Sequence, residues 1–352
     1  MAQTAQAVAL FHDKKGRAKD YPVALLPLID THGHLTDFDE NTPTRALARA
    51  AQAGVCHLVS PVDPTDDATD PRHLMYAFHM WCKDAHTLID AQRQAGVSFP
   101  KFEGQEAHGR TADAAEIAHF VRIVAGVHPY GAKAYLEDPE VKKHLIFILR
   151  CPVCVGVGEI GLDYTCGVDH EEQKRAFIEQ LDTAQDWGLP VELHIRDARA
   201  DSTAEAHRDA LKILKQVGIP KAGCDLHCFT STPDILRDFV AIGCSVAFGG
   251  ALTFKSSDEI RDAALVCPQH ALLSETDCPY MAPVPLRGME AEPAMVAYVA
   301  AALAQLRLEH GEADSLNQTY QALWDNGNTL FFSNASKLDL SDQDAWYPCL
   351  TS

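Results

Sequence analysis

The chain has 352 residues, of which 47% are hydrophobic and 22% are charged, and its formal net charge at pH 7 is −19. This length and apolar content allow one large domain or two ordinary ones with a substantial core. No apolar run approaches the roughly 20 residues of a membrane span, and the amino terminus lacks the pattern of a secretory signal. The acidic balance argues against the wide basic face that duplex-binding proteins use. The 11 cysteines show no framework spacing, which indicates a reducing, cytoplasmic environment.

Apolar runs and chain breakers alternate along the chain and predict alternating strands and helices. In chain order, the predicted strands are Leu28–His32, Val55–Ser60, Arg122–Val127, Val153–Glu159, Pro190–His194, Cys224–His227, Cys244–Phe248 and Ala271–Glu275. The predicted helices are Thr44–Ala53, Pro71–Ala95, Asp169–Trp187, Ala204–Val217, Pro233–Ile242, Ser257–Val266, Glu292–His310 and Asp314–Phe332. Gly54, Gly188 and Gly218 are helix-stop signals, and Thr232 before Pro233 is typical of a helix start.

Eight strands with intervening helices predict an α/β fold, the closed (β/α)8 TIM barrel. The main alternative is a doubly wound open sheet. Side chains that can bind metal follow the first, fourth, fifth, sixth and eighth predicted strands. The ends of those strands could not all converge in an open sheet, whereas a closed ring brings them together at its carboxyl-terminal mouth. The sequence therefore favours the barrel.

The predicted domain organisation is a single barrel domain at residues 24–332 with three additions. Residues 1–23 are polar and are interpreted as an arm over the barrel's bottom or a mobile end. Residues 61–120 are longer than an ordinary crossover between strands and are interpreted as an excursion near the active-site mouth. Residues 333–352 form a carboxyl-terminal tail.

A histidine pair follows the first predicted strand. His32 and His34 are two residues apart, so on a strand end they face the same side, and Asp30 lies beside them. Two imidazoles and a carboxylate suit one divalent metal ion. Two surface histidines in a turn are the alternative, which the preceding buried-looking strand makes less favourable.

A glutamate ends the fourth predicted strand. Glu159 follows a run of small and apolar residues, where a carboxylate needs a compensating charge such as a metal ion. Its two oxygens could bridge two ions about 3.5–4 Å apart. Pairing with a lysine is the alternative.

The fifth, sixth and eighth strands each end at a further candidate ligand. His194 and His227 occupy equivalent places and would bind the second ion, although each alone is more often a core histidine. Asp277 could bind the first ion and accept a proton from its water. Glu275 alternates with Asp277 and could support the ligands from behind.

Three residues are candidates for binding substrate. Arg196 shares the direction of His194, and a fixed planar cation beside a metal site suits phosphate or carboxylate groups. Arg287 lies in the loop after the eighth strand and could act likewise. His128 ends the third strand and could contact substrate or relay a proton. Surface salt bridges and loop hydrogen bonds are the respective alternatives.

Six segments, in order, make the chain resemble the TatD-like metal-dependent hydrolases, a branch of the amidohydrolase-like superfamily. They are DTHGHL (30–35), GVHPY (126–130), GEIGLDY (158–164), LHIRDA (193–198), LHCFT (226–230) and SETDCPY (274–280). The resemblance covers about residues 28–332. It implies that His32, His34, Glu159 and Asp277 hold one ion, and that Glu159, His194 and His227 hold the other.

The resemblance also implies phosphodiester cleavage in DNA, often as an exonuclease. The chain differs from the family pattern at Ser231, which follows HCFT in place of glycine, and at Ala291, which stands where asparagine is common. We expect two divalent ions, such as Zn, Mg or Mn, to activate a water molecule, with a nucleic acid or other phosphoester as substrate. The alternatives are an amide, ester or lactone hydrolase on the same dinuclear site, and a non-enzymatic binding protein.

Overall fold

The computed structural model describes residues 10–65, 70–107, 109–199, 202–333, 335–343 and 346. Its centre is an eight-stranded sheet, ordered β12-β11-β10-β9-β8-β7-β4-β3, in which every neighbouring pair is parallel. The strands are β3 (Leu28–Asp30), β4 (Val55–Val62), β7 (Val121–Ala125), β8 (Cys154–Asp163), β9 (Val191–Arg196), β10 (Cys224–Leu226), β11 (Ser245–Phe248) and β12 (Leu272–Ser274). Each corresponds to one predicted strand, with ends that differ by up to four residues.

The first and last strands meet, and their contact closes the ring. Thr31 N–H donates to Ser274 C=O at 3.2 Å, and His34 N–H donates to Cys278 C=O at 2.7 Å. Gly33 forms a parallel bridge with Cys278, and a Cβ at Gly33 would lie only 2.8 Å from the Cys278 Sγ. A side chain at Gly33 would therefore push the two strands apart. The prediction of a closed TIM barrel is confirmed.

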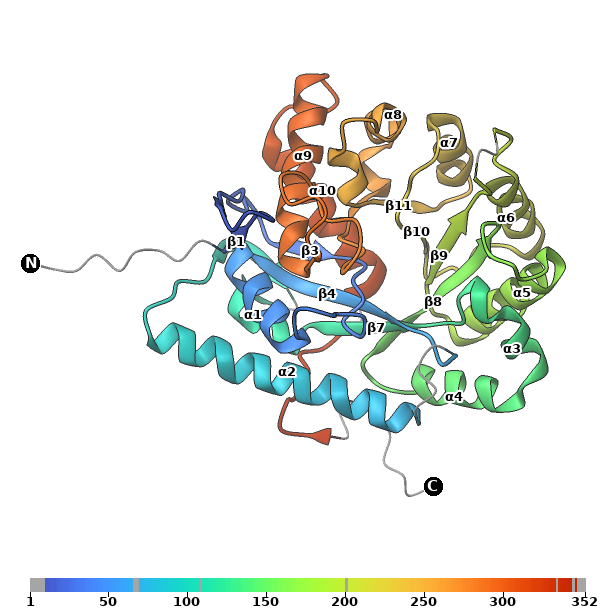
Figure 1. Cartoon of the computed structure of the whole chain (residues 1–352), viewed down its shortest axis with the longest axis horizontal. Coiled ribbons are helices and arrows are strands. Elements are labelled where there is room, and N and C mark those ends of the chain that lie inside the picture. Colours follow the sequence, from blue (N-terminus) through green and yellow to red (C-terminus); the bar gives the residue numbers. More distant parts are fainter. Residues whose placement is uncertain are drawn as a thin grey trace, which may run out of the picture.

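Helices surround the ring of strands (Figure 1). They are α1 (Pro43–Ala53), α2 (Pro71–Gln94), α3 (Ala132–Glu137), α4 (Pro139–Leu149), α5 (His170–Trp187), α6 (Glu205–Val217), α7 (Pro233–Ala241), α8 (Asp258–Val266), α9 (Val296–Glu309) and α10 (Leu316–Gly327). Thr232 accepts a hydrogen bond from Ile235 N–H and caps α7, and Gly54 and Gly188 end α1 and α5 in the left-handed conformation, as predicted. The sequence reading missed α3 and α4.

Short elements complete the chain. Two antiparallel pairs join β1 (Phe11–His12) to β2 (Ala18–Lys19) and β5 (Lys101–Ala107) to β6 (Arg110–Asp113). The short helical turns are η1 (Ala114–His119), η2 (Pro129–Gly131), η3 (Gly250–Thr253), η4 (Gln269–Ala271), η5 (Pro293–Met295) and the π-helical η6 (Asn328–Phe332). In the described part of the chain, no helix has the length and apolarity needed to cross a membrane.

Among the described residues of the excursion at 61–120, those that line the mouth lie at its start. Pro61, Val62 and Asp63 line the cavity at the carboxyl ends of the strands. The chain then descends through α2 on the outside of the barrel, and the hairpin β5–β6 lies at the opposite end. A Cβ built at Gly54, just before β4 begins, would lie 3.3 Å from the Phe102 ring. The interpretation of the whole excursion as a structure near the active-site mouth was wrong.

The described parts of the arm and the tail pack against the barrel. Phe11 is buried against Tyr298 of α9, and Arg49 of α1 lies over its ring. In the tail, Leu338 N–H donates to His119 C=O, and Trp346 is fully buried. The arm therefore lies on the outer flank between α1 and α9. The division into arm, barrel and tail remains our proposal.

Candidate metal centre

The polar side chains that follow the strands gather around one cavity at the carboxyl ends of the barrel. The cavity has a volume of about 740 Å³. Its lining includes His34, His128, Glu159, His194, Arg196, His227 and Asp277, together with Asp63, Tyr130, Cys228 and Tyr280. His32 lies beneath this surface and is fully buried. The barrel thus brings together all six residues predicted to bind metal.

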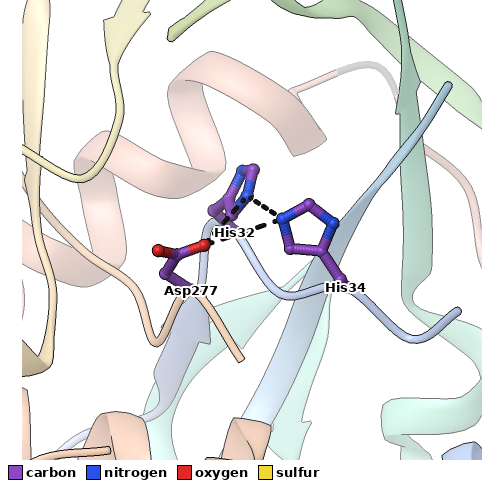
Figure 2. Close-up of side chains that lie close together, drawn as sticks. All are labelled: His32, His34 and Asp277. Atoms are coloured by element: carbon purple, nitrogen blue, oxygen red, sulfur yellow. Dashed lines mark hydrogen bonds and ion pairs between the residues drawn. The ribbon is translucent and has the colours of Figure 1, made fainter. Parts of the chain in front are cut away.

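The first donor group contains the histidine pair and an aspartate (Figure 2). His32 Nε2 lies 3.0 Å from His34 Nε2, and Asp277 Oδ1 lies 3.7 Å and 3.6 Å from these two nitrogens. Asp277 has a φ of 53°, in the left-handed region that aspartate tolerates better than most residues. This conformation turns its carboxylate back over the end of β3, toward the imidazoles.

Glu159 connects the first group to a second one. Its Oε2 lies 3.6 Å from His34 Nε2 and 3.9 Å from His32 Nε2. Its Oε1 lies 2.9 Å from His227 Nε2 and 3.2 Å from His194 Nδ1, and those two nitrogens are 3.2 Å apart. Each oxygen of this carboxylate therefore faces a different set of nitrogens, which is the arrangement of a bridging ligand.

These spacings fit the ligands of divalent metal ions. A tetrahedral ion with bonds of about 2.0–2.2 Å holds its ligand atoms about 3.3–3.6 Å apart. The donor atoms of both groups are separated by 2.9–3.9 Å. Imidazole with carboxylate is a donor set shared by zinc, manganese, iron and nickel. The residues therefore fit divalent ions, with Glu159 between the two groups.

Glycines of β8 let the neighbouring strand bring its histidine close to Glu159. A Cβ at Gly158 would lie 2.6 Å from the Glu192 Cβ, and one at Gly161 would lie 2.1 Å from the His194 carbonyl oxygen. Gly161 also has a φ of 147°, where a side chain would be strained. These glycines therefore permit the close approach of β9 to β8 around Glu159.

Each of the four proposed imidazole ligands has a carboxylate close to its other ring nitrogen. His32 Nδ1 lies 2.8 Å from Glu192 Oε1, and His194 Nε2 lies 3.3 Å from Asp163 Oδ2. Longer separations join His34 Nδ1 to Asp37 at 3.6 Å and His227 Nδ1 to Glu275 at 3.8 Å. Such partners orient metal-binding imidazoles and raise their basicity.

The sequence predicts this supporting role for Glu275 only. The sequence reading missed Glu192, although a glutamate two residues before His194 must face the barrel interior with it. It also placed Asp30 beside the metal ligands. In the structure Asp30 Oδ2 accepts a hydrogen bond from the Thr276 hydroxyl at 2.6 Å, and its Oδ1 accepts one from Thr276 N–H at 2.8 Å. Asp30 therefore links β3 to the segment that follows β12.

The carboxylates of the site favour positive charge on or near the imidazoles. Burial alone would raise the pKa of Glu159, but the nearby imidazoles of His227 and His32 hold it well below the ordinary range. Burial also lowers the pKa of His34, yet its contact with Asp277 outweighs that effect and raises the pKa to about 9. For His194, contacts with Asp163 and Glu159 likewise overcome burial and raise the pKa to about 9. Without metal, protons on these imidazoles balance the carboxylates.

The three candidate substrate residues are placed differently. Arg196 and His128 both line the cavity, and the His128 ring packs against the His194 ring with centroids 4.2 Å apart. Burial lowers the pKa of His128 to about 3, so this imidazole is neutral at physiological pH. Arg287 is not among the described residues that line the cavity, and its guanidinium lies over the Phe254 ring.

Comparisons with known proteins agree with this geometry. Residues 29–332 match the family model described as TatD related DNase. The chain is 35% identical over 214 residues to the uncharacterized metal-dependent hydrolase YcfH of Escherichia coli (strain K12), which covers 60% of this chain and 74% of that protein. It is 30% identical over 257 residues to the 3'-5' ssDNA/RNA exonuclease TatD of Pantoea vagans (strain C9-1), covering 69% and 94%.

A solved structure is also similar. The crystal structure of YJJV, a TatD homolog from Escherichia coli K12, has a TM-score of 0.57 and 26% identity, and covers 86% of this chain and 97% of that one. The family model spans more than half of the chain, and it includes both donor groups. The chain therefore belongs to the TatD-related DNase family of metal-dependent hydrolases.

Proposed function

We propose that this protein is a divalent-metal-dependent phosphodiesterase that removes nucleotides from the 3′ end of single-stranded nucleic acid. The observation that carries the proposal is the position of Glu159, whose two oxygens face two separate sets of imidazole nitrogens. Two ions held about 3.5–4 Å apart suit in-line displacement at a phosphorus atom. The 3'-5' ssDNA/RNA exonuclease of Pantoea vagans supports the choice of substrate and direction.

Each ion has a proposed set of ligands. His32, His34, Glu159 and Asp277 would hold the first ion, and Glu159, His194 and His227 would hold the second. When bound, the ions would lower the pKa of a coordinated water toward neutrality and polarise a phosphoryl oxygen.

Asp277 is placed to accept the proton of the attacking water. Its Oδ1 faces the imidazoles of the first group, while its Oδ2 lies on the other side, 3.4 Å from the Cys228 Sγ. One oxygen can therefore bind the ion while the other takes the proton. The His34 imidazole keeps the pKa of Asp277 below its ordinary value despite burial, so the group is a carboxylate at neutral pH.

Residues in the cavity would contact the negatively charged groups of the substrate. The chain carries a net charge of −19, so its overall charge does not attract a polyanion. Arg196 lines the cavity with its side chain exposed and can pair with a phosphate in a fork geometry. His128 is neutral there and can donate or accept a hydrogen bond without adding charge.

Hydrolysis by metal-reconstituted protein tests the proposal. Purified protein is loaded in turn with Zn²⁺, Mn²⁺ and Mg²⁺ and assayed on 5′-labelled single-stranded DNA and RNA, and on lactone and amide substrates. Asp277→Asn should keep the fold, as measured by circular dichroism, and lower turnover by about 10²–10⁴ because general-base catalysis is lost. Asp234→Asn, which changes an exposed carboxylate of α7, is the control and should retain full activity.

The outcomes separate the competing functions. Shortening of labelled strands from the 3′ end supports the proposal. Turnover of a lactone or amide, without cleavage of any phosphodiester, would instead establish the alternative hydrolase. Near-normal turnover by Asp277→Asn would reject the role assigned to that residue.

A further inference from the structure

We propose that Glu192 is a positioning residue of the first donor group, which holds His32 in the tautomer that presents its Nε2 lone pair to the metal ion. The inference rests on the proposed metal centre and adds a residue outside its ligand set. It concerns a carboxylate in the interior of the barrel, on β9, below the side chains that line the cavity.

Geometry links Glu192 to one nitrogen of His32. Glu192 Oε1 lies 2.8 Å from His32 Nδ1, the shortest of the four contacts between a supporting carboxylate and a proposed imidazole ligand. Among the described residues, Glu192 is the only partner of this nitrogen. Both side chains are completely buried, so bulk water does not substitute for the contact.

The contact determines which imidazole nitrogen is free. In a neutral imidazole one nitrogen carries the proton and the other is the acceptor or metal ligand. Glu192 Oε1 accepts the proton of Nδ1, also when the carboxyl group carries a proton of its own on Oε2, so Nε2 keeps its lone pair. That Nε2 lies 3.0 Å from His34 Nε2 and 3.7 Å from Asp277 Oδ1, which places it inside the first donor group.

The His32 ring has little freedom to find another arrangement. It stacks on the His227 ring with centroids 4.1 Å apart and lies at 77° to the His34 ring. A 180° ring flip would put Cδ2 in the place of Nδ1 and Cε1 in the place of Nε2, so it would remove the contacts of both nitrogens. Without Glu192, a buried N–H would lose its acceptor, which is unfavourable.

Asp225 provides a matched control. It is the register partner of Glu192 on the neighbouring strand β10, and both residues have an exposed fraction of 0%. Neither oxygen of Asp225 has a hydrogen-bond partner in the described part of the chain. Substitution of Asp225 therefore removes a buried carboxylate from the same layer of the barrel without removing an acceptor from an imidazole.

Two measurements on the full-length protein test the role of Glu192. The tautomer of His32 is read from its imidazole ¹⁵N shifts in the metal-free protein, assigned by comparison with His32→Gln. The affinity for each of two Zn²⁺ or Mn²⁺ ions is measured by competition with a chromophoric chelator. Thermal unfolding of each variant is recorded alongside.

Glu192→Leu should mix or invert the His32 tautomers. It should also lower the affinity for the first ion by about 10- to 100-fold, as losses of such supporting carboxylates do in other metal sites. Binding of the second ion should stay near that of the wild type. Glu192→Gln keeps an acceptor oxygen, so it should preserve the tautomer and weaken the first ion less than Glu192→Leu. Asp225→Val should change neither the tautomer nor the affinities.

The outcomes are distinguishable from failure of the metal centre. If the wild type binds no ion, the metal centre is wrong, and the ¹⁵N shifts still decide whether Glu192 controls the tautomer. Wild-type shifts and affinities in Glu192→Leu would overturn the inference, as would equal losses in Glu192→Leu and Asp225→Val. If Glu192→Leu does not fold, Glu192→Gln decides, because wild-type shifts together with wild-type affinity for the first ion in this variant would contradict a role for the carboxylate.

Discussion

Replacement of Glu159 by glutamine should weaken the binding of both metal ions. The two carboxylate oxygens lie 2.9 Å from His227 Nε2 and 3.6 Å from His34 Nε2, so the change removes a charge common to both donor groups. Removing one partner of a buried ion pair costs about 3–5 kcal/mol because the remaining charge is uncompensated. At about 1.4 kcal/mol per tenfold change, each ion should bind about 100- to 3,000-fold more weakly.

The assay is metal competition with a chromophoric chelator, with metal content after dialysis as a second readout. His194→Gln is the comparison, because His194 contacts only one oxygen of Glu159 and should weaken only the second ion. Loss of a single ion in Glu159→Gln, with normal affinity for the other, would refute the bridging role. Equal loss of both ions in His194→Gln would show that the two sites cannot be assigned separately.

Two further predictions follow from the charges in the cavity. His34 and His194 have pKa values of about 9 in the metal-free protein, so metal binding at neutral pH should release protons, and metal affinity should rise with pH up to about 9. Calorimetry in buffers of different ionisation enthalpy measures this proton release. Absence of proton release would contradict the protonated state of the two imidazoles. Arg196→Ala should raise KM for single strands with unchanged metal content, whereas Arg287→Ala should resemble the wild type in steady-state kinetics, because only Arg196 lines the cavity.

The barrel was predictable because its strands carry strong local signals. β4, for example, is buried at every position, and its sequence is almost continuously apolar, as is typical of a strand covered on both faces. The excursion was misplaced because the sequence shows that α2 is a helix but not where the chain goes afterwards. The contact between Phe102 and the start of β4 depends on packing between distant segments, which periodicity does not report.

The proposed metal ligands were predictable because each lies in the carboxyl-terminal half of a strand or shortly after its end, and a closed barrel brings such positions to one place. The residues behind them were harder to identify. Glu192 lies within an apolar strand, and its partner His32 is 160 residues away, so its role depends on how β9 and β3 face each other across the barrel. Arg287 was proposed from its loop alone, and the direction of a loop side chain does not follow from strand order.

The acidic character of the protein and its proposed substrate are compatible because the barrel concentrates carboxylates where cations bind. Asp277 belongs to the first donor group, and Glu159 and Glu192 contact its imidazoles. Glu275 is buried 3.8 Å from His227 Nδ1. Burial raises the pKa of Glu192 to about 8 and that of Glu275 well above the ordinary range, so an interior without cations disfavours their charged forms. Two dications would supply four positive charges to this layer. A phosphodiester would then meet a mouth whose local charge is set by its ions and by Arg196, and the negative charge of the outer surface would act at longer range, where salt screens it.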